Sequence, residues 1–314
     1  GARTKKPGAY EKWSTRVSAK AFLSDKASLL LRYMHEDRND PRGVVNGTYS
    51  KDGVVYSAGD AYAGAVFGLG RRDFAANART DFRMRSDTLQ LTGEFDLGAV
   101  DLKSYTQYRE EEVTQHTEGD YSSYAVLSLG LPDRSKIMSQ ELVINSKPGG
   151  RLQYSGGLFL FRQKVDAEVK LAAPFAAAYG LAPDAATLFD FSATGAKVST
   201  YAVFADVTYE AVDNVFITGG LRASRDEVKG VYYQTFPGVP DMLTYQPDRK
   251  DDKVTPRVVV RYKPSNESSI YASFSKGYKS AIPDYRSTSG KPYLEPENVD
   301  AWEMGAKYGT GRLS

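Results

Sequence analysis

The sequence predicts an all-β fold, namely an incomplete antiparallel up-and-down β-barrel wall that spans a membrane, with short turns on one edge and long loops on the other. Two observations predict it. Apolar and polar residues alternate along the predicted strands with a period of two, which places them on opposite faces of a sheet. The connections between strands alternate between short turns and long loops, as they do in outer-membrane barrels.

The alternation is clearest in the hairpin at 201–223. One face of its first strand is apolar and carries a tyrosine at each end, Tyr201 and Tyr209. Eight steps of about 3.3 Å, tilted by about 40°, rise roughly 20 Å, close to the apolar band of an outer-membrane barrel. Tyrosines at both edges suit the two membrane interfaces. A half-buried strand of a soluble β-sandwich would show the same alternation, so this hairpin alone leaves both folds open.

The same pattern predicts about eleven strands along the chain, near 10–23, 27–36, 85–97, 99–113, 137–146, 151–166, 198–211, 215–228, 252–263, 268–279 and 297–308. Turn residues occupy the short connections at 24–26, 97–98, 147–150, 212–214 and 264–267. The long connections cover 37–84, 114–136, 167–197, 229–251 and 280–296. A soluble sandwich has no reason to place every long loop at one end, whereas an outer-membrane barrel does.

Several strands repeat the two-sided pattern, and we expect their apolar face to meet lipid. The clearest members of that face are Val203, Val207, Ile217, Leu221, Val258, Val260, Trp302 and Met304. We expect these side chains to be exposed in a structure without lipid, because the apolar patch of a membrane protein is far larger than that of a soluble monomer. Burial against a second layer would instead indicate a sandwich.

Composition excludes several classes of protein. The 314 residues include no cysteine, so there is no disulfide framework and no thiolate site. The net charge is only +2 and no Lys/Arg run occurs, which argues against nucleic acid as a partner. No stretch approaches eighteen uncharged apolar residues, which excludes a membrane-spanning helix. The N-terminal residues do not form a signal peptide, so the start of an exported protein would be missing.

Three parts of the chain resemble one family of receptors. They are MSQELVINSKPGGRLQYSGGLFLFRQKVDAE at 138–168, YAVFADVTYEAVDNVFITGGLRASRDEVK at 201–229, and TPRVVVRYKPSNESSIYASFSKGYKS at 255–280 followed by LEPENVDAWEMGAKY at 294–308. Each is similar to a hairpin or strand of the TonB-dependent outer-membrane receptors, and they occur in the family's order.

The resemblance implies a barrel of about 22 strands closed by a plug, located in the bacterial outer membrane. It implies import of a scarce small-molecule ligand, such as an iron–siderophore or similar chelate, with energy from the TonB protein passed through the plug. Outer-membrane lipid would be a further partner. The sequence shows no plug and ends at a short turn, and an odd strand count does not suit a closed bacterial barrel. We therefore expect residues 1–314 to be an internal part of a single barrel domain, without the N-terminal plug and the C-terminal strands.

Charged residues on the polar face are the candidates for the ligand path. They could guide an anionic ligand or contact the plug, although pairing with one another across strands would also account for them. These candidates are Arg16, Lys20, Arg32, Lys103, Arg109, Asp206, Glu210, Arg222, Arg257 and Arg261. Aromatic residues of the long loops could hold a ligand from outside or pack the loops together; they are Tyr232, Tyr233, Phe236, Tyr245, Tyr285 and Tyr293.

One contact on the polar face can be predicted in detail. The turn at 212–214 places Asp206 opposite Arg222 or one diagonal step away, and cross-strand neighbours at this spacing are within reach of an arginine. We therefore predict a carboxylate–guanidinium contact between them.

The sequence contains no recognisable catalytic or metal-binding motif. His35 and His116 lack the paired spacing of a metal site and are expected to be solvated loop residues. No clustered nucleophile and base occur, so we expect neither an enzyme nor a cofactor. The leading hypothesis is energised transport, and the alternative is a passive porin-like or structural barrel. A plug upstream of this chain would distinguish the first from the second.

Overall fold

The computed structural model describes residues 11–41, 80–118, 128–172, 189–235, 243–245, 248–283 and 293–309. All regular elements within these ranges are strands: β1 (Glu11–Ser24), β2 (Ala27–Asp40), β3 (Asp81–Asp96), β4 (Val100–Glu118), β5 (Ser128–Ser146), β6 (Leu152–Ala172), β7 (Phe189–Val212), β8 (Val215–Thr235), β9 (Leu243–Tyr245), β10 (Asp248–Ser265), β11 (Ser268–Lys279), β12 (Ile282–Pro283), β13 (Tyr293–Leu294) and β14 (Glu297–Tyr308). No helix in these ranges is long and apolar enough to cross a membrane.

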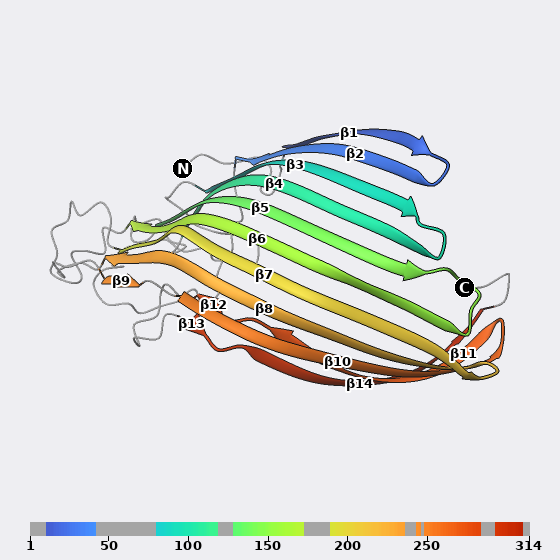
Figure 1. Ribbon diagram of the computed structural model, residues 1–314. Coiled ribbons are helices and arrows are strands. Elements are labelled where there is room, and N and C mark those ends of the chain that lie inside the picture. Colours follow the sequence, from blue (N-terminus) through green and yellow to red (C-terminus); the bar gives the residue numbers. More distant parts are fainter. Residues whose placement is uncertain are drawn as a thin grey trace, which may run out of the picture.

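The main strands form one curved antiparallel sheet in chain order, β1-β2-β3-β4-β5-β6-β7-β8-β10-β11-β14 (Figure 1). Short β9 pairs with β8, and β12 pairs with β13 in a separate two-stranded sheet. The two-residue turn before β8 depends on Asn214, whose φ of 67° lies in the left-handed region that asparagine tolerates. The short turns lie at one edge of the sheet, and the strand ends that the long connections join lie at the other, which confirms the predicted architecture.

Several strands extend farther toward the long-loop edge than the sequence indicated. β5 begins at Ser128 rather than near 137, and β7 begins at Phe189 rather than near 198. β8 continues to Thr235, and β10 begins at Asp248. Charged residues, glycines and Pro132 interrupt these extensions, so the apolar alternation that identifies a strand within the membrane does not continue through them. Backbone pairing nevertheless continues through them.

The apolar face of the sheet is its exposed outer face. Along β7, residues 201, 203, 205, 207 and 209 are exposed, whereas the residues between them are half-buried or buried. A curved sheet spreads side chains apart on its convex side and crowds them on its concave side, so the apolar face is convex. All eight side chains predicted to meet lipid are exposed, from 43% at Ile217 to 85% at Met304. This confirms the two-sided pattern and excludes a sandwich.

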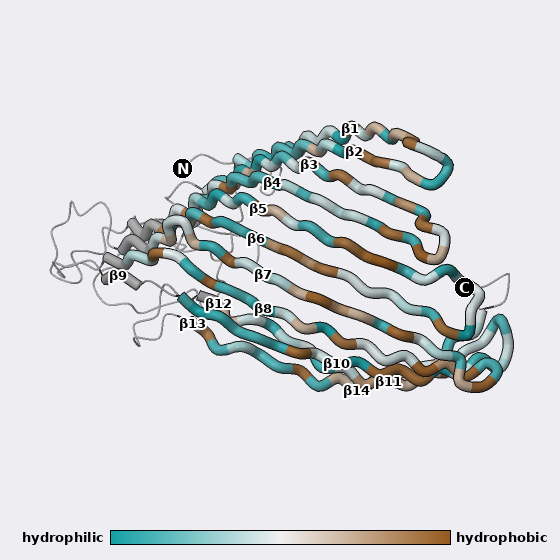
Figure 2. Tube along the Cα trace, in the orientation of Figure 1, coloured by the Kyte–Doolittle hydropathy of each residue, from teal (hydrophilic) through white to brown (hydrophobic). Residues whose placement is uncertain are grey.

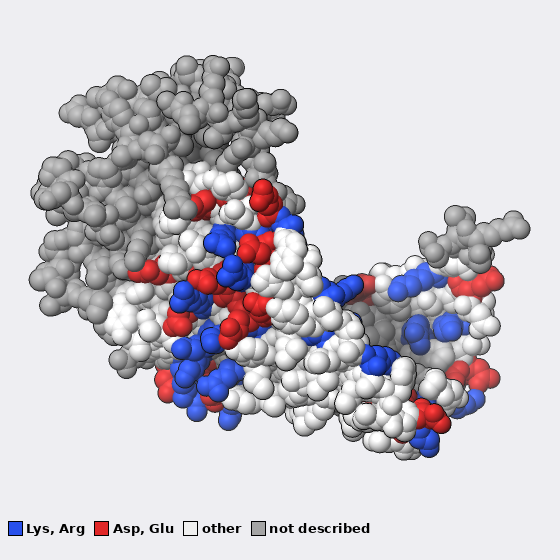
Figure 3. Space-filling model, turned by 90° about the horizontal axis from the view of Figure 1, so that it is seen from above, with Lys and Arg blue, Asp and Glu red and all other residues white. Residues whose placement is uncertain are grey.

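Charge and hydropathy divide the sheet along its strands as well. Figure 2 shows hydrophobic residues in the middle and turn-side parts of the strands and hydrophilic residues toward the long-loop edge. Figure 3 shows acidic and basic side chains mixed in a dense band toward that edge, with largely uncharged surface between it and the smaller charged groups at the turn edge. The buried apolar cluster among the described residues is small, formed by Ala193, Ala196 and Tyr232. The sheet is thus a single layer with little core of its own.

Candidate functional site

The concave face carries all ten charged residues predicted for the ligand path. Residues paired in succession across the sheet share a face, and one such row runs through Phe22, Ser28, Glu94, Lys103, Val143, Gly157, Phe204, Arg222 and Thr255. Every second residue along each strand lies on the same face as its member of this row. This rule places on the concave face Arg16, Lys20, Arg32, Lys103, Arg109, Asp206, Glu210, Arg222, Arg257 and Arg261.

Asp206 contacts Arg257 rather than Arg222. Oδ1 of Asp206 accepts hydrogen bonds from Nε and Nη2 of Arg257, at 3.2 and 2.8 Å. Both residues are paired with Gly220, one from each side. The Asp206 side chain lies across Gly220, where an added Cβ would be 3.0 Å from Cγ of Asp206. The predicted Asp206–Arg222 contact is therefore wrong. Arg222 does lie one diagonal step away, but the missing side chain at Gly220 opens a path to the next strand.

Arg222 rests on aromatic rings. Its guanidinium carbon lies 5.3 Å from the ring centre of Phe159 and 5.9 Å from that of Phe204, within the range of cation–π interaction. Phe204 in turn covers Gly157, where a Cβ would be 2.7 Å from the ring. The described residues place no carboxylate in an ion pair with Arg222. Its donors are thus held in place by two rings and remain free to bind an anion.

Arg222 and Arg257 border one hollow of about 370 Å³ on this face. Phe204, Asp206 and Gly220 line it as well, together with Glu141, Thr255 and Ser275. The hollow therefore combines two guanidinium groups, one of them paired with Asp206, with a second carboxylate, Glu141, and an aromatic wall. Such a surface can bind a planar or anionic group through charge-assisted hydrogen bonds.

Most of the other predicted charges pair within the sheet. Glu94 lies between Lys20, at 4.0 Å, and Lys103, at 3.2 Å. Arg32 donates to the side-chain oxygen of Gln90 at 3.1 Å, and Arg109 forms an ion pair with Glu111. These contacts support the alternative interpretation, in which the charges of this group pair across strands and stabilise the sheet.

The remaining three charges differ from one another. Glu210 accepts the Asn214 backbone N–H at 3.0 Å and so belongs to the turn. Arg261 lies over the Phe216 ring at 4.8 Å, and Arg16 is exposed.

A polar cluster that the sequence did not predict lies at the long-loop end of the concave face. Arg249 donates to both carboxylate oxygens of Asp251 at 2.8 and 3.0 Å and to Glu295 at 3.1 Å. Its guanidinium also lies 4.4 Å from the ring centre of Tyr293, one of the predicted aromatic candidates. The charged run DRKDDK at 248–253 was the available signal, but its lack of apolar residues led to a predicted strand that begins only at 252, with 248–251 placed in a loop. Arg249 and Asp251 instead belong to β10.

The other aromatic candidates separate into two groups. Tyr232 is 3% exposed and packs with Ala193 and Ala196, so it stabilises the sheet, while its neighbour Tyr233 is half-buried in β8. Phe236 and Tyr285 lie outside the described residues, as does the side chain of Tyr245.

Both histidines lie in strands, so the expectation of solvated loop residues is wrong. Nδ1 of His35 lies 2.7 Å from Oδ1 of Asp87, and Nδ1 of His116 lies 2.6 Å from Oδ1 of Asp81. Each partner comes from the neighbouring strand β3, whose loop-side extension was not predicted in full. Within the described ranges, no three His, Cys, Asp or Glu residues are grouped as a metal site would need.

The chain is similar to a known family of proteins. The family model described as TonB dependent receptor-like, beta-barrel, matches residues 13–314. The pesticin receptor of Yersinia enterocolitica is 28% identical over 135 residues, which are 42% of this chain and 20% of that protein, and that of Yersinia pestis matches equally.

Solved structures share the fold. The ferric yersiniabactin uptake receptor from Yersinia pestis superimposes with a TM-score of 0.79 at 16% identity, over 97% of this chain and 44% of that chain. A ferric citrate transporter gives 0.65 at 14% identity, over 96% and 41%. The chain thus spans less than half the length of these relatives. Its strand order, its two faces and the match over nearly all its residues show that it belongs to the TonB-dependent receptors, a family of non-enzymatic transporters of the bacterial outer membrane, as part of the β-barrel domain.

Proposed function

We propose that this chain forms part of the barrel wall of a receptor that imports an iron–siderophore or a similar metal chelate. The plug, the remaining strands and the contact with TonB would come from other parts of the full-length protein. The lengths of the relatives, of which this chain spans less than half, support this. Relatives described as receptors or transporters of ferric yersiniabactin and ferric citrate support the chelate. A copper transporter with a TM-score of 0.64 shows that the fold also carries other cargo.

The observation that carries the proposal is Arg222. Its guanidinium is stacked on Phe159 and Phe204, forms no ion pair within the described residues, and borders a hollow of about 370 Å³ with Arg257. A cation that is positioned but not neutralised favours an anionic ligand passing along the concave face.

Uptake of labelled ferric chelates by cells carrying the full-length receptor tests the proposal. We expect Arg222→Gln to weaken binding of an anionic chelate by about tenfold or more, because one charge-assisted hydrogen-bonding group is lost. Arg85→Gln is the matched control, since Arg85 lies on the convex face and pairs with Asp37. Equal uptake by both variants at equal surface levels would contradict the role of Arg222.

A second uptake experiment distinguishes energised transport from passage through a passive barrel. Uptake should stop in cells that lack TonB. Uptake that continues without TonB would instead identify a passive channel.

A further inference from the structure

Four lysines face one another across four adjacent strands. Lys136 of β5 is paired with Lys164 of β6, Lys164 with Lys197 of β7, and Lys197 with Lys229 of β8. All four side chains are exposed on the convex face. Adjacent strands lie about 4.8 Å apart, so the four positions span only about 15 Å. Like charges placed directly opposite each other destabilise a sheet, and this lysine row places three such pairs in succession.

Acidic groups neutralise the lysine row mainly at its ends. Lys136 pairs with Glu110 at 2.9 Å, and Lys229 pairs with Asp248 at 3.6 Å. Within the described residues, the two middle lysines have one acidic partner between them: Lys164 lies 3.7 Å from Asp166, and Lys197 forms no ion pair.

The charges next to the lysine row do not neutralise its two middle lysines. Arg162 is exposed two residues from Lys164 on the same face and forms no ion pair within the part of the chain that the structure describes. Glu227, on the adjacent row, is 3.6 Å from Lys250. The centre of the row therefore carries a surplus of positive charge.

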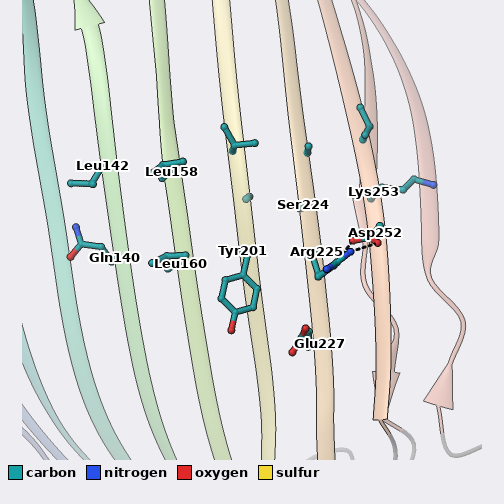
Figure 4. Close-up of a pocket in the computed structure, with 14 residues that line it drawn as sticks. Gln140, Leu142, Leu158, Leu160, Tyr201, Ser224, Arg225, Glu227, Asp252 and Lys253 are labelled. Carbon is teal, nitrogen blue, oxygen red and sulfur yellow. Dashed lines mark hydrogen bonds and ion pairs between the residues drawn. The ribbon is translucent and has the colours of Figure 1, made fainter.

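An apolar hollow lies on the same strands, toward the turn edge. It has a volume of about 680 Å³, and its lining includes Leu142, Leu158, Leu160, Tyr201 and Val203 (Figure 4). Leu160 and Tyr201 are four residues from Lys164 and Lys197 along their strands, a distance of about 13 Å. The lysine row and the hollow thus form one continuous surface, cationic toward the long loops and apolar toward the middle of the sheet.

We propose that this surface binds one anionic lipid of the outer leaflet, with phosphate groups on Lys164, Lys197 and Arg162 and an acyl chain in the hollow. The charge surplus selects an anion with more than one negative charge, and the apolar hollow beside it selects an amphiphile. A soluble anion would leave the hollow empty, and a neutral lipid would leave the repulsion between the lysines uncompensated. The long-loop edge is extracellular in outer-membrane barrels, so the outer leaflet supplies the lipid.

Binding of a bisphosphorylated glycolipid to the purified full-length receptor in detergent micelles tests the proposal, with the dephosphorylated glycolipid and inorganic phosphate as comparison probes. Each lysine near an anionic lipid surface contributes about fivefold, so Lys164→Gln with Lys197→Gln should weaken binding about 30-fold. Lys276→Gln should leave it unchanged, because Lys276 is an exposed lysine farther along the same face that pairs with Asp300. Equal binding by the double variant, or equal binding of the dephosphorylated glycolipid, would overturn the proposal.

Two further measurements distinguish a loss of lipid binding from misfolding of the double variant. Without lipid, the double variant should unfold at the same or a higher temperature than the parent, because repulsion between lysines is removed. Ala223→Trp keeps every lysine but fills the hollow, and it should weaken binding of the glycolipid. Displacement of the glycolipid by millimolar inorganic phosphate, or full binding by Ala223→Trp, would show an anion site without a lipid chain and contradict the proposal.

Discussion

At the scale of single residues, small side chains decide which large ones meet on the concave face. Gly220 lets Asp206 reach Arg257 across an intervening strand, and Gly157 leaves room for the Phe204 ring that supports Arg222. Glycine weakens a strand interior, so its use here implies a need for close approach. The arrangement of the ligand-path candidates thus depends on two residues that carry no functional group.

Substituting Gly220 tests whether the Asp206–Arg257 contact depends on the missing side chain at this position. Gly220→Ala places a Cβ against the Asp206 carboxylate, and we expect it to lower the free energy of unfolding of the full-length receptor in lipid vesicles. The ion pair is largely exposed, so its loss alone should cost about 1 kcal/mol or less, with the steric conflict added. Gly219→Ala is the control, because nothing lies within 4 Å of a Cβ there. An equal effect of the two substitutions would show that the Asp206–Arg257 contact does not depend on Gly220.

At the scale of the element, each strand carries two environments one residue apart. In β10, Val258 is exposed on the convex face, whereas Val259 is half-buried on the concave face. Val258 lies in the apolar run between Val254 and Tyr262 on the convex face, whereas Val259 lies between Arg257 and Arg261 on the concave face. A valine therefore faces lipid at one position and the concave side of the sheet at the next.

Arginine at these two positions should have unequal effects. Val258→Arg should destabilise the full-length receptor in bilayers by about 2–4 kcal/mol, the cost of an arginine at the bilayer midplane on the lipid face. Val259→Arg should cost much less, because its charge faces the concave side. Denaturant unfolding in vesicles measures both. A larger cost at Val259 would reverse the assignment of the two faces.

The short turn between β5 and β6 has its own electrostatic contact. Nζ of Lys147 lies 3.0 Å from Oδ1 of Asp96 and also contacts Asp101, so it ties this turn to the turn between β3 and β4. Hydrogen bonds to Asp101 and Asp96 raise the pKa of Lys147 above its ordinary value of 10.5. A raised pKa of a lysine means that its stabilisation is complete below the ordinary value and is lost as pH rises through the raised one.

The stability difference between the parent receptor and Lys147→Met should follow this titration. It should be constant up to about pH 10 and disappear at higher pH, because deprotonated lysine no longer attracts the two carboxylates. Unfolding in denaturant across this pH range measures it. A difference that persists after deprotonation would assign the role of Lys147 to packing.

At the scale of the whole molecule, the described strands form one layer with two free edges. β1 and β14 each pair with a single neighbour, and Trp302 and Met304 on β14 are 80% and 85% exposed. Unpaired backbone groups at an edge pair readily with another chain, and they are costly within a bilayer. The described strands therefore need neighbours on both sides to complete the wall.

Self-association should reveal these edges. Residues 1–314 expressed alone in detergent micelles should form oligomers through β1 and β14, whereas the full-length receptor should remain monomeric. Light scattering coupled to size-exclusion chromatography measures the mass of each. A monomeric isolated chain with intact β-structure would show that the edges are protected.

The order of the strands, the alternation of turns and loops, and the face of each side chain within the predicted strands all follow from the sequence. These features depend on local chemistry, namely the period of two and the residues that turns require. The folded sheet was needed to identify the partner of Asp206, the pairing of His35 with Asp87, and the lysine row formed by Lys136, Lys164, Lys197 and Lys229. The reason is that such contacts depend on the register between strands. Backbone pairing sets that register, and it brings together residues dozens of positions apart whose own neighbours in the sequence carry no sign of it.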